Sequence, residues 1–475
     1  MKDVSEKLQI IRNYDPVMTQ QQQHCREEEL QSSTGCSDAR LAPPLPNAIG
    51  TLPDELLAEI FTLHLHGGTS ANTFHVRIQS VCHRWHNIAI STPRLWVKIR
   101  VLLSYYCCTK LAIVKRHLEL SRNAPLDIEV RFLDALNLKP TFPQTTVLDM
   151  IVSALPRCQI LHVFRHPTFP YILPLSSELP LLEELYVTPR WGEKSDTLRS
   201  GSFMPRLHSF VIEDYRAGAA CLRISPVDLF GSSLTTLHFT QAVHPYDALS
   251  LIMASPQLRT LSWKYRRNAP WPTHPLGPNP LILDFLEDFR LHGDPYKVFT
   301  HLHAPNVVTF NHGDPQLGDI RDEGIFGPEP RFPLLQHLKL VGSHRHTSAE
   351  HLRRLFQNHP LLEQVTLTMS LSSPELWLGL LVLVENDEQP GSQGHPIQDC
   401  IAPRLRCLVI HSDDFGIHAQ PSVKQTLTQT QMLQSLLRNS EARADGGFSI
   451  RLSASTISPS VLELEAEFPT RFFVE

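Results

Sequence analysis

The sequence has few cysteines and no concentrated basic charge. Its 475 residues contain nine cysteines, none spaced as Cys-x-x-Cys, so neither a disulfide framework nor a zinc module is indicated. The 43 Lys and Arg are outnumbered by 48 Asp and Glu, which gives a net charge of −5 with no basic block. A dedicated nucleic-acid-binding protein concentrates positive charge against phosphates. We therefore expect no nucleic-acid partner.

Long hydrophobic runs are also missing. The longest, Leu376–Val384, is far shorter than the roughly 20 residues that a membrane-spanning helix needs. The first 25 residues carry scattered charges and no apolar stretch typical of a signal peptide. We expect no membrane partner and a location in a reducing intracellular compartment, in the cytoplasm, the nucleus or both.

The sequence lacks common catalytic and nucleotide-binding motifs. It contains no G-x-S-x-G, H-E-x-x-H, G-x-x-x-x-G-K-[ST] or G-x-G-x-x-G. Three His-x-His pairs, at residues 64/66, 301/303 and 344/346, are the main candidate metal ligands. A metal site needs a third or fourth ligand, and none is spaced nearby. We expect no metal, no cofactor and no catalytic residue, and hence a protein that is not an enzyme.

Polar segments divide the chain into regions. Residues 1–48 include a glutamine run and several prolines, and they bury too little apolar surface to offset the entropy of ordering, so we predict a disordered tail. A second polar stretch, at about residues 386–399, predicts a surface loop. Near the end, the alternation of Phe448, Ile450 and Leu452 predicts a closing strand.

Between these segments the chain repeats itself. The pattern Pro-x-Leu-x-x-Leu-x-Leu recurs, with other large apolar residues allowed at the Leu positions. Copies start 21–28 residues apart, except for a last gap of 43 that contains the polar loop. His312 breaks the last apolar position of one copy. The copies begin at Pro156, Pro180, Pro205, Ser232, Pro256, Asp284, Pro305, Pro333, Pro360 and Pro403.

A period of 20–29 residues with this pattern is typical of a leucine-rich-repeat solenoid. The last two apolar positions of each copy lie two residues apart, so both face one side of a short strand. The proline ends the preceding helix, because the residue before proline is disfavoured in helical conformation. Amphipathic helices are predicted between copies, for example at residues 246–253 and 349–356.

One such unit cannot bury its apolar face alone, so neighbouring units must stack. No copy carries the Asn that commonly follows the strand in these repeats, so the predicted array is irregular. Chance recurrence of leucine-rich strands in another α/β protein is the alternative. We predict a leucine-rich-repeat-like α/β solenoid over residues 101–475.

A second motif precedes the repeats. Residues 52–61 read LPDELLAEIF, residues 81–85 read VCHRW, and residues 93–96 read PRLW. This order resembles the F-box family, whose pattern is LPxElLxxIF, a variable spacer, VCrxW and a Pro-x-Leu-Trp close. The resemblance implies a small all-helical F-box, which we assign to residues 49–100. The expected fold class is therefore α/β, with this F-box followed by the irregular solenoid.

The residues of the first F-box segment support a partner-binding role. In a helix that starts near Pro53, three apolar side chains share one face, and Leu57 and Phe61 occupy the adjoining stripe. The shared face consists of Leu56, Ile60 and Leu63. This apolar surface is too wide for one short helix to bury, and a module of this size is marginal alone. The module therefore needs a partner, its trailing domain, or both.

The resemblance implies that the partner is the Skp-type linker subunit of cullin-based ubiquitin ligases, and through it a cullin. The spacer at residues 64–80 departs from the family pattern, because it lacks the usual Asp-Leu start of a second helix and contains Gly67 and Gly68. Leu57, Leu95 and Trp96 are expected to be core residues instead of contacts. Carried over by position, the partner-binding residues are Leu52, Pro53, Ile60, Phe61, Val81, Cys82 and Trp85.

The implied function is that of a non-catalytic substrate-recognition adaptor of a Skp–cullin–F-box-type ubiquitin ligase. The repeat region would hold a protein target near the charged ubiquitin-conjugating enzyme. The alternative is a repeat scaffold whose F-box serves only assembly or turnover of the chain itself. An enzyme built on the repeat region has no supporting motif.

Overall fold

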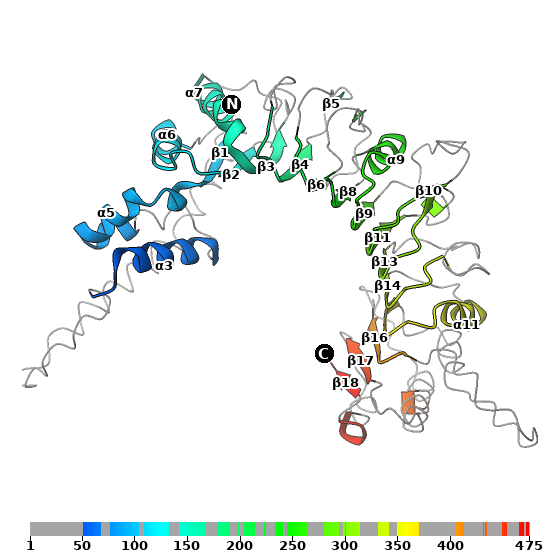
Figure 1. The fold of residues 1–475 in the computed structure, drawn as a ribbon. Coiled ribbons are helices and arrows are strands. Elements are labelled where there is room, and N and C mark those ends of the chain that lie inside the picture. The colour runs from blue at the N-terminus through cyan, green and yellow to red at the C-terminus, as the bar shows by residue number, and fades with distance from the viewer. Residues whose placement is uncertain are drawn as a thin grey trace, which may run out of the picture. The chain divides into compact units, whose positions relative to one another are not determined.

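The structure is a computed structural model, shown as a ribbon in Figure 1. The predicted tail and polar loop, and the pair at residues 344/346, lie outside the described residues. By its internal contacts the chain divides into two units, residues 1–64 and 65–475, each of which is described by itself. The residues described are 51–67, 77–103, 109–132, 142–166, 178–189, 197–198, 204–213, 223–224, 233–240, 243, 245–264, 280–293, 298–299, 301–313, 331–341, 349–369, 404–412, 431, 433–434, 449–453, 465–469 and 472–474.

The described part of the first unit consists mainly of helix α3 (Asp54–Gly67), which continues to the start of the second unit. Pro53 precedes the helix, and its carbonyl oxygen accepts the Leu57 N–H at 3.2 Å. Two carboxylates in the first turn suit the positive end of the helix dipole. The helix ends at Gly67, the first of the two glycines in the spacer.

The second unit begins with short helical segments and then forms one large sheet. Its helical segments include residues 77–81, α5 (His83–Ser91), η1 (Pro93–Trp96), α6 (Leu111–Leu120), α7 (Phe142–Ala154), η2 (Leu155–Arg157), α9 (Pro245–Met253) and α11 (Ala349–Asn358). The predicted helices at residues 246–253 and 349–356 are present as α9 and α11. In Figure 1, α6, α7, α9 and α11 all lie on the same side of the strands. Among the described residues, no helix combines the length and apolar character needed to cross a bilayer.

The main sheet has fourteen strands whose spatial order follows the sequence, and every pair is parallel. Its strands are β1 (Lys98–Leu103), β2 (Leu126–Phe132), β3 (Cys158–His166), β4 (Glu184–Pro189), β6 (Ser209–Ile212), β8 (Thr236–Phe239), β9 (Thr260–Lys264), β11 (Asp288–His292), β13 (Thr309–Gly313), β14 (His337–Val341), β15 (Gln364–Met369), β16 (Cys407–Ser412), β17 (Ser449–Ser453) and β18 (Phe472–Val474). Two small parallel pairs lie outside it, β5 (Thr197–Leu198) with β7 (Arg223–Ile224), and β10 (Leu281–Ile282) with β12 (Leu302–His303).

The sheet brings the repeat copies into register. The strand residues predicted to share one face pair with their equivalents in the next copy, as Leu161 pairs with Leu185 and Val163 with Val187. These side chains are buried and form two apolar rows along the sheet. The predicted closing strand is present as β17, whereas β1, β2 and β18 lie outside the recurring pattern and were not predicted.

The recurring proline occupies a turn that the sequence did not predict. In the copy at Pro180, the Leu182 N–H donates to the Leu179 carbonyl at 3.2 Å, which closes a four-residue turn with proline at its second position. The same bond recurs in the copies at Pro205 and Pro256. Proline suits this position because its ring fixes φ near the value that common turns require.

His312 is the exception in the apolar rows. It pairs with Leu291 on one side and Leu340 on the other, and it is fully buried. Its Nε2 lies 2.9 Å from the carbonyl oxygen of Gly293. This hydrogen bond explains how an imidazole occupies an apolar position. Gly293 has φ of 134°, a conformation that glycine adopts without strain.

Trp96 connects α5 to α6 within the second unit. Its indole Nε1 donates to the Ala89 carbonyl oxygen at 2.7 Å. Its ring lies edge-on to His117 at 5.1 Å between centroids, and the Arg116 guanidinium lies 5.5 Å from the ring centroid. Trp96 and Leu95 are buried, as the sequence predicted for core residues. This tryptophan therefore holds the end of the short helical segments against the start of the sheet.

Buried histidines make the stability of the second unit depend on pH. Burial lowers the pKa of His117, His301 and His359 below 6.5, the ordinary value for a histidine side chain. The unfolded chain binds protons at these sites more readily, so the free energy of unfolding decreases as the pH falls through about 6.5. Thermal unfolding at pH 7.5, 6.5 and 5.5 should show a lower midpoint at each step. A double variant, His117→Gln with His359→Gln, should show a smaller decrease; the same decrease as wild type would contradict this assignment.

Candidate functional site

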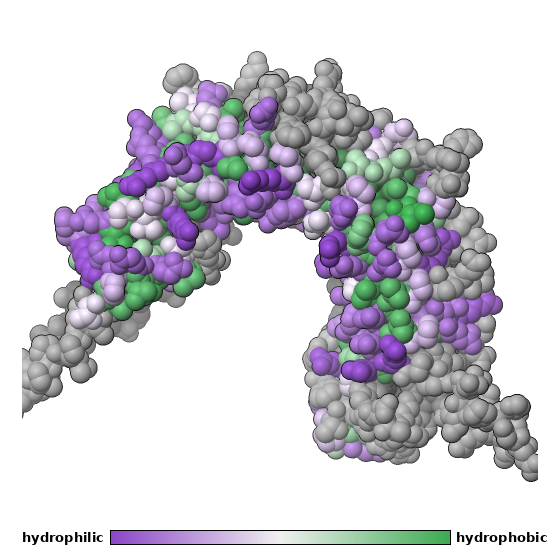
Figure 2. Space-filling view, in the orientation of Figure 1, coloured by the Kyte–Doolittle hydropathy of each residue, from purple (hydrophilic) through white to green (hydrophobic). Residues whose placement is uncertain are grey.

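Helix α3 carries two apolar stripes with opposite exposure. One stripe is buried and consists of Leu57, Phe61 and Leu65. The other is exposed and consists of Leu56 at 52%, Ile60 at 48% and Leu63 at 64%. We call Leu56, Ile60 and Leu63 the exposed stripe. Hydrophobic residues reach the surface along this helix in Figure 2. A contiguous apolar surface of this kind marks an interaction site more often than a solvated face.

The residues predicted to bind a partner differ in exposure. Pro53, Ile60, Val81 and Cys82 are exposed, and Leu52 and Trp85 are half-buried. Phe61 is only 4% exposed, because it lies one helical turn after Leu57 on the buried stripe. Positional transfer from the family pattern did not include Leu56 and Leu63, although the helical period had placed both on the face of Ile60.

The VCHRW motif lies at the start of α5. Val81 is the last residue of the preceding helical segment and is 58% exposed. Cys82 has an extended backbone and occupies the N-cap position of α5 without a capping hydrogen bond from its side chain. Trp85 follows within the first turn, and the buried residues Ile88 and Ala89 lie one turn further along the same side of the helix. The structure thus brings Val81, Cys82 and Trp85 together at one helix end.

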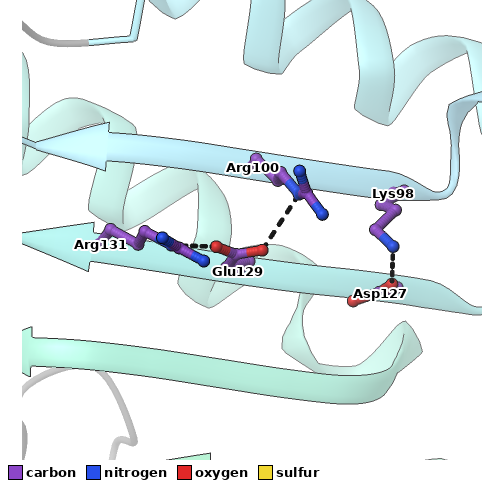
Figure 3. A network of polar contacts seen from close by, with 5 residues as sticks. All are labelled: Lys98, Arg100, Asp127, Glu129 and Arg131. Atoms are coloured by element: carbon purple, nitrogen blue, oxygen red, sulfur yellow. Dashed lines mark hydrogen bonds and ion pairs between the residues drawn. The ribbon is translucent and has the colours of Figure 1, made fainter. Parts of the chain in front are cut away.

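The sheet presents a second candidate surface. Alternate strand residues point away from the buried apolar rows, and we call the surface that they form the open face. At its beginning, Glu129 of β2 bridges two arginines: Arg100 Nε lies 3.1 Å from one carboxylate oxygen, and Arg131 Nε bonds the other (Figure 3). Lys98 Nζ lies 3.6 Å from Asp127 Oδ2 beside them. These pairs balance most of the charge on β1 and β2.

No metal-ligand cluster occurs within the part of the chain that the structure describes. There, no group of three or more His, Cys, Asp or Glu side chains is arranged to hold an ion. His301 is buried and His303 is exposed, so this pair does not share one environment. The described residues therefore offer no donor set for a metal.

Comparison with known families bears on the first surface. An F-box-like family model matches residues 49–101. These residues are an F-box-like domain. The domain contains α3 with its exposed stripe, the VCHRW motif and Trp96, and it ends within β1. F-box domains generally bind a Skp-type subunit and are typically non-catalytic adaptors. No curated protein sequence matches the chain.

Two cysteines in this structure should differ sharply in reactivity. Cys82 of the F-box-like domain is exposed, whereas burial raises the pKa of the Cys158 thiol to about 12. Thiolates are the reactive form, so iodoacetamide at pH 8 should alkylate Cys82 and leave Cys158 unmodified in the folded protein. Peptide mass spectrometry measures both sites. Unfolding in guanidinium should expose Cys158 as the control, and equal alkylation of the two thiols without denaturant would contradict the described burial.

Proposed function

We propose that the chain is a substrate-recognition adaptor of a Skp–cullin–F-box-type ubiquitin ligase. The observation that carries the proposal is the exposed stripe of α3 inside an F-box-like domain. The domain binds the Skp-type linker subunit and, through it, a cullin. The sheet region binds a protein target. The chain contributes no catalytic residue and acts in the cytoplasm, the nucleus or both.

In this proposal the linker covers apolar surface that the chain leaves open. Ile60 is the central contact on α3, with Leu56 and Leu63 beside it, and Val81, Cys82 and Trp85 contribute from the start of α5. Burying each large apolar side chain stabilises a complex by about 1.5–3 kcal/mol. Trp85 has the large, partly polar ring that commonly dominates interface energy. Phe61 supports the site from the buried side of α3, and Leu52 and Pro53 precede the helix.

The proposed fold of the second unit is an irregular leucine-rich-repeat-like solenoid. Support comes from the register, because each strand pairs with the equivalent positions of the next copy. The recurring turn at proline and the helices between strands further support it. A stacked array of this kind leaves its open face along the whole sheet for a target.

The proposed mechanism is proximity. The linker and cullin hold the chain near a charged ubiquitin-conjugating enzyme, and the open face holds the target. Tethering raises the effective concentration of target lysines at the transfer site without any new chemistry from this chain.

Removing the exposed stripe should abolish linker binding. In full-length chain co-expressed with the linker subunit, Leu56→Ala with Ile60→Ala removes two apolar contacts, so linker affinity should fall by at least about 10²-fold. Quantitative co-purification measures the loss. Lys339→Ala, an exposed change on β14, is the matched control and should retain the linker. Circular dichroism checks that the double variant folds, and a folded variant that retains wild-type amounts of linker would overturn the proposed interface.

The alternative function, a scaffold whose F-box serves assembly or self-turnover only, makes a different prediction. Cells that express either wild-type chain or the Leu56→Ala, Ile60→Ala variant, together with tagged ubiquitin, are compared by mass spectrometry. An adaptor should cause F-box-dependent ubiquitination of at least one other protein bound to the chain. If the chain itself is the one protein whose modification depends on the stripe, the scaffold function is favoured.

A further inference from the structure

The charge on the open face changes along the sheet. From β1 to β4 the outward cations that the structure describes are matched by outward carboxylates. The cations are Lys98, Arg100 and Arg131, and the carboxylates are Asp127, Glu129 and Glu184. From β9 to β16 the charged outward residues that the structure describes are Lys264, Arg290, Lys339 and Asp288. Cations outnumber carboxylates there, so this part of the open face is basic.

The arginine in this basic part is already neutralised. Arg290 bonds both carboxylate oxygens of Asp288, with Nη2 at 2.8 Å from Oδ2 and Nε at 3.3 Å from Oδ1. Lys264 and Lys339 are exposed, and neither makes an ion pair with any residue of the described part of the chain. The excess positive charge of the open face between β9 and β16 therefore belongs to these two lysines.

The surroundings of the two lysines favour carboxylates over other anions. Among the described outward side chains from β9 to β16 there is no Phe, Tyr or Trp, and single-stranded nucleic acids usually stack their bases on such rings. Phosphate groups suit the fork of an arginine, and Arg290 is occupied by Asp288. The uncharged outward residues are Thr260, Ser262, His292, Thr309, Asn311, His337, Val341, Gln364, Thr366, Cys407, Val409 and His411.

The positions of the two lysines define a spacing for their ligand. The path from β9 to β14 passes through β11 and β13, so it takes three strand-to-strand steps of about 4.8 Å, or about 14 Å in all. Lys339 lies in the register row of Arg290, two positions before the row of Lys264. An extended peptide advances about 3.3 Å per residue and turns alternate side chains to one face. Two acidic residues four positions apart therefore span about 13 Å on one face, and the flexible lysine stems accommodate the remaining offset.

We propose that the open face from β9 to β14 binds an extended acidic segment of a target protein. One carboxylate of the segment pairs with Lys264, and a second, four residues away, pairs with Lys339. This inference rests on the proposed function, because it names the chemistry of the target segment that the adaptor holds. Charge complementarity carries the choice of occupant, since it selects an acidic partner and rejects a basic one.

The test uses three fluorescein-labelled Gly-Ser peptides, which carry two Glu four residues apart, two adjacent Glu, or two Lys four residues apart. Each is titrated against the full-length chain purified with its linker subunit, or with a solubility tag if no linker binds. Fluorescence anisotropy should show that the spaced-Glu peptide binds at least about tenfold more tightly than the Lys peptide and about threefold more tightly than the adjacent-Glu peptide. The preference should weaken between about 50 mM and 500 mM salt. Lys-peptide binding as tight as spaced-Glu binding would overturn the inference, and equal binding of the two Glu peptides would overturn the assigned spacing.

Charge-reversal variants locate the binding site. Lys264→Glu and Lys339→Glu should each weaken spaced-Glu binding by about tenfold, because repulsion replaces attraction. Lys115→Glu, an exposed change on α6, alters the net charge equally and is the matched control, so it should retain affinity within about threefold. Circular dichroism checks that each variant folds. Folded open-face variants that bind as wild type does, or a control that loses as much affinity as they do, would overturn the site.

Two other occupants are tested on the same preparations. Oligo-dT of about ten nucleotides represents nucleic acid, and its affinity should change by less than about threefold in the two lysine variants. Oligo-dT binding that is tighter than peptide binding and is lost in both variants would overturn the protein assignment. The chain's own acidic run is replaced by Gln at Glu27, Glu28 and Glu29 in the full-length chain, which should leave peptide affinity unchanged. A gain of about tenfold or more would show that this run occupies the face, and would overturn the target assignment.

The two proposals can fail independently. Linker co-purification is scored on the same preparations and depends on α3, whereas peptide binding depends on β9 and β14. Loss of the linker with retained preference for the spaced-Glu peptide would overturn the ligase proposal alone. Retained linker with no peptide preference would overturn the acidic-segment site alone.

Discussion

The sheet depends on the stacking of two buried side chains from each strand. In β3 these are Leu161 and Val163, and each lies beside an equivalent apolar residue on β2 and on β4. A single strand with its connecting segment has nothing to cover these side chains, so stability comes from the neighbours on both sides. The recurring turn at proline comes directly before the strand in the copies at Pro180, Pro205 and Pro256. The register of the sheet is consistent with this requirement.

Because one side of every strand is committed to the core, the opposite side is free to vary. On β3 and β4 this opposite side carries a contact between the rings of Phe164 and Tyr186, with 5.0 Å between centroids. Ion pairs on β1 and β2 balance their own charges.

The F-box-like domain also has apolar side chains that are buried and apolar side chains that are exposed. One stripe of α3 is buried and the other is open, although their residues are equally apolar. At the other end of the domain, Trp96 bonds α5 and contacts α6, so the VCHRW motif belongs to the same unit as the sheet. The part of the F-box-like domain from residue 65 onward therefore belongs to the same unit as the sheet.

Local patterns in the sequence were enough to predict most strands, because two apolar residues in alternation after a turn define both the strand and its buried side. The same patterns predicted α9, α11 and the core positions of Leu95 and Trp96. They did not predict β1, β2 or β18, which have no recurring motif and form because a neighbouring strand offers unpaired backbone groups. Phe61 shows the limit for the binding site: a motif names the residue, but only packing decides which stripe of a helix is covered. The sequence also did not predict the contacts of His162 and Phe164 with Tyr186, because these rings meet only when β3 and β4 lie side by side.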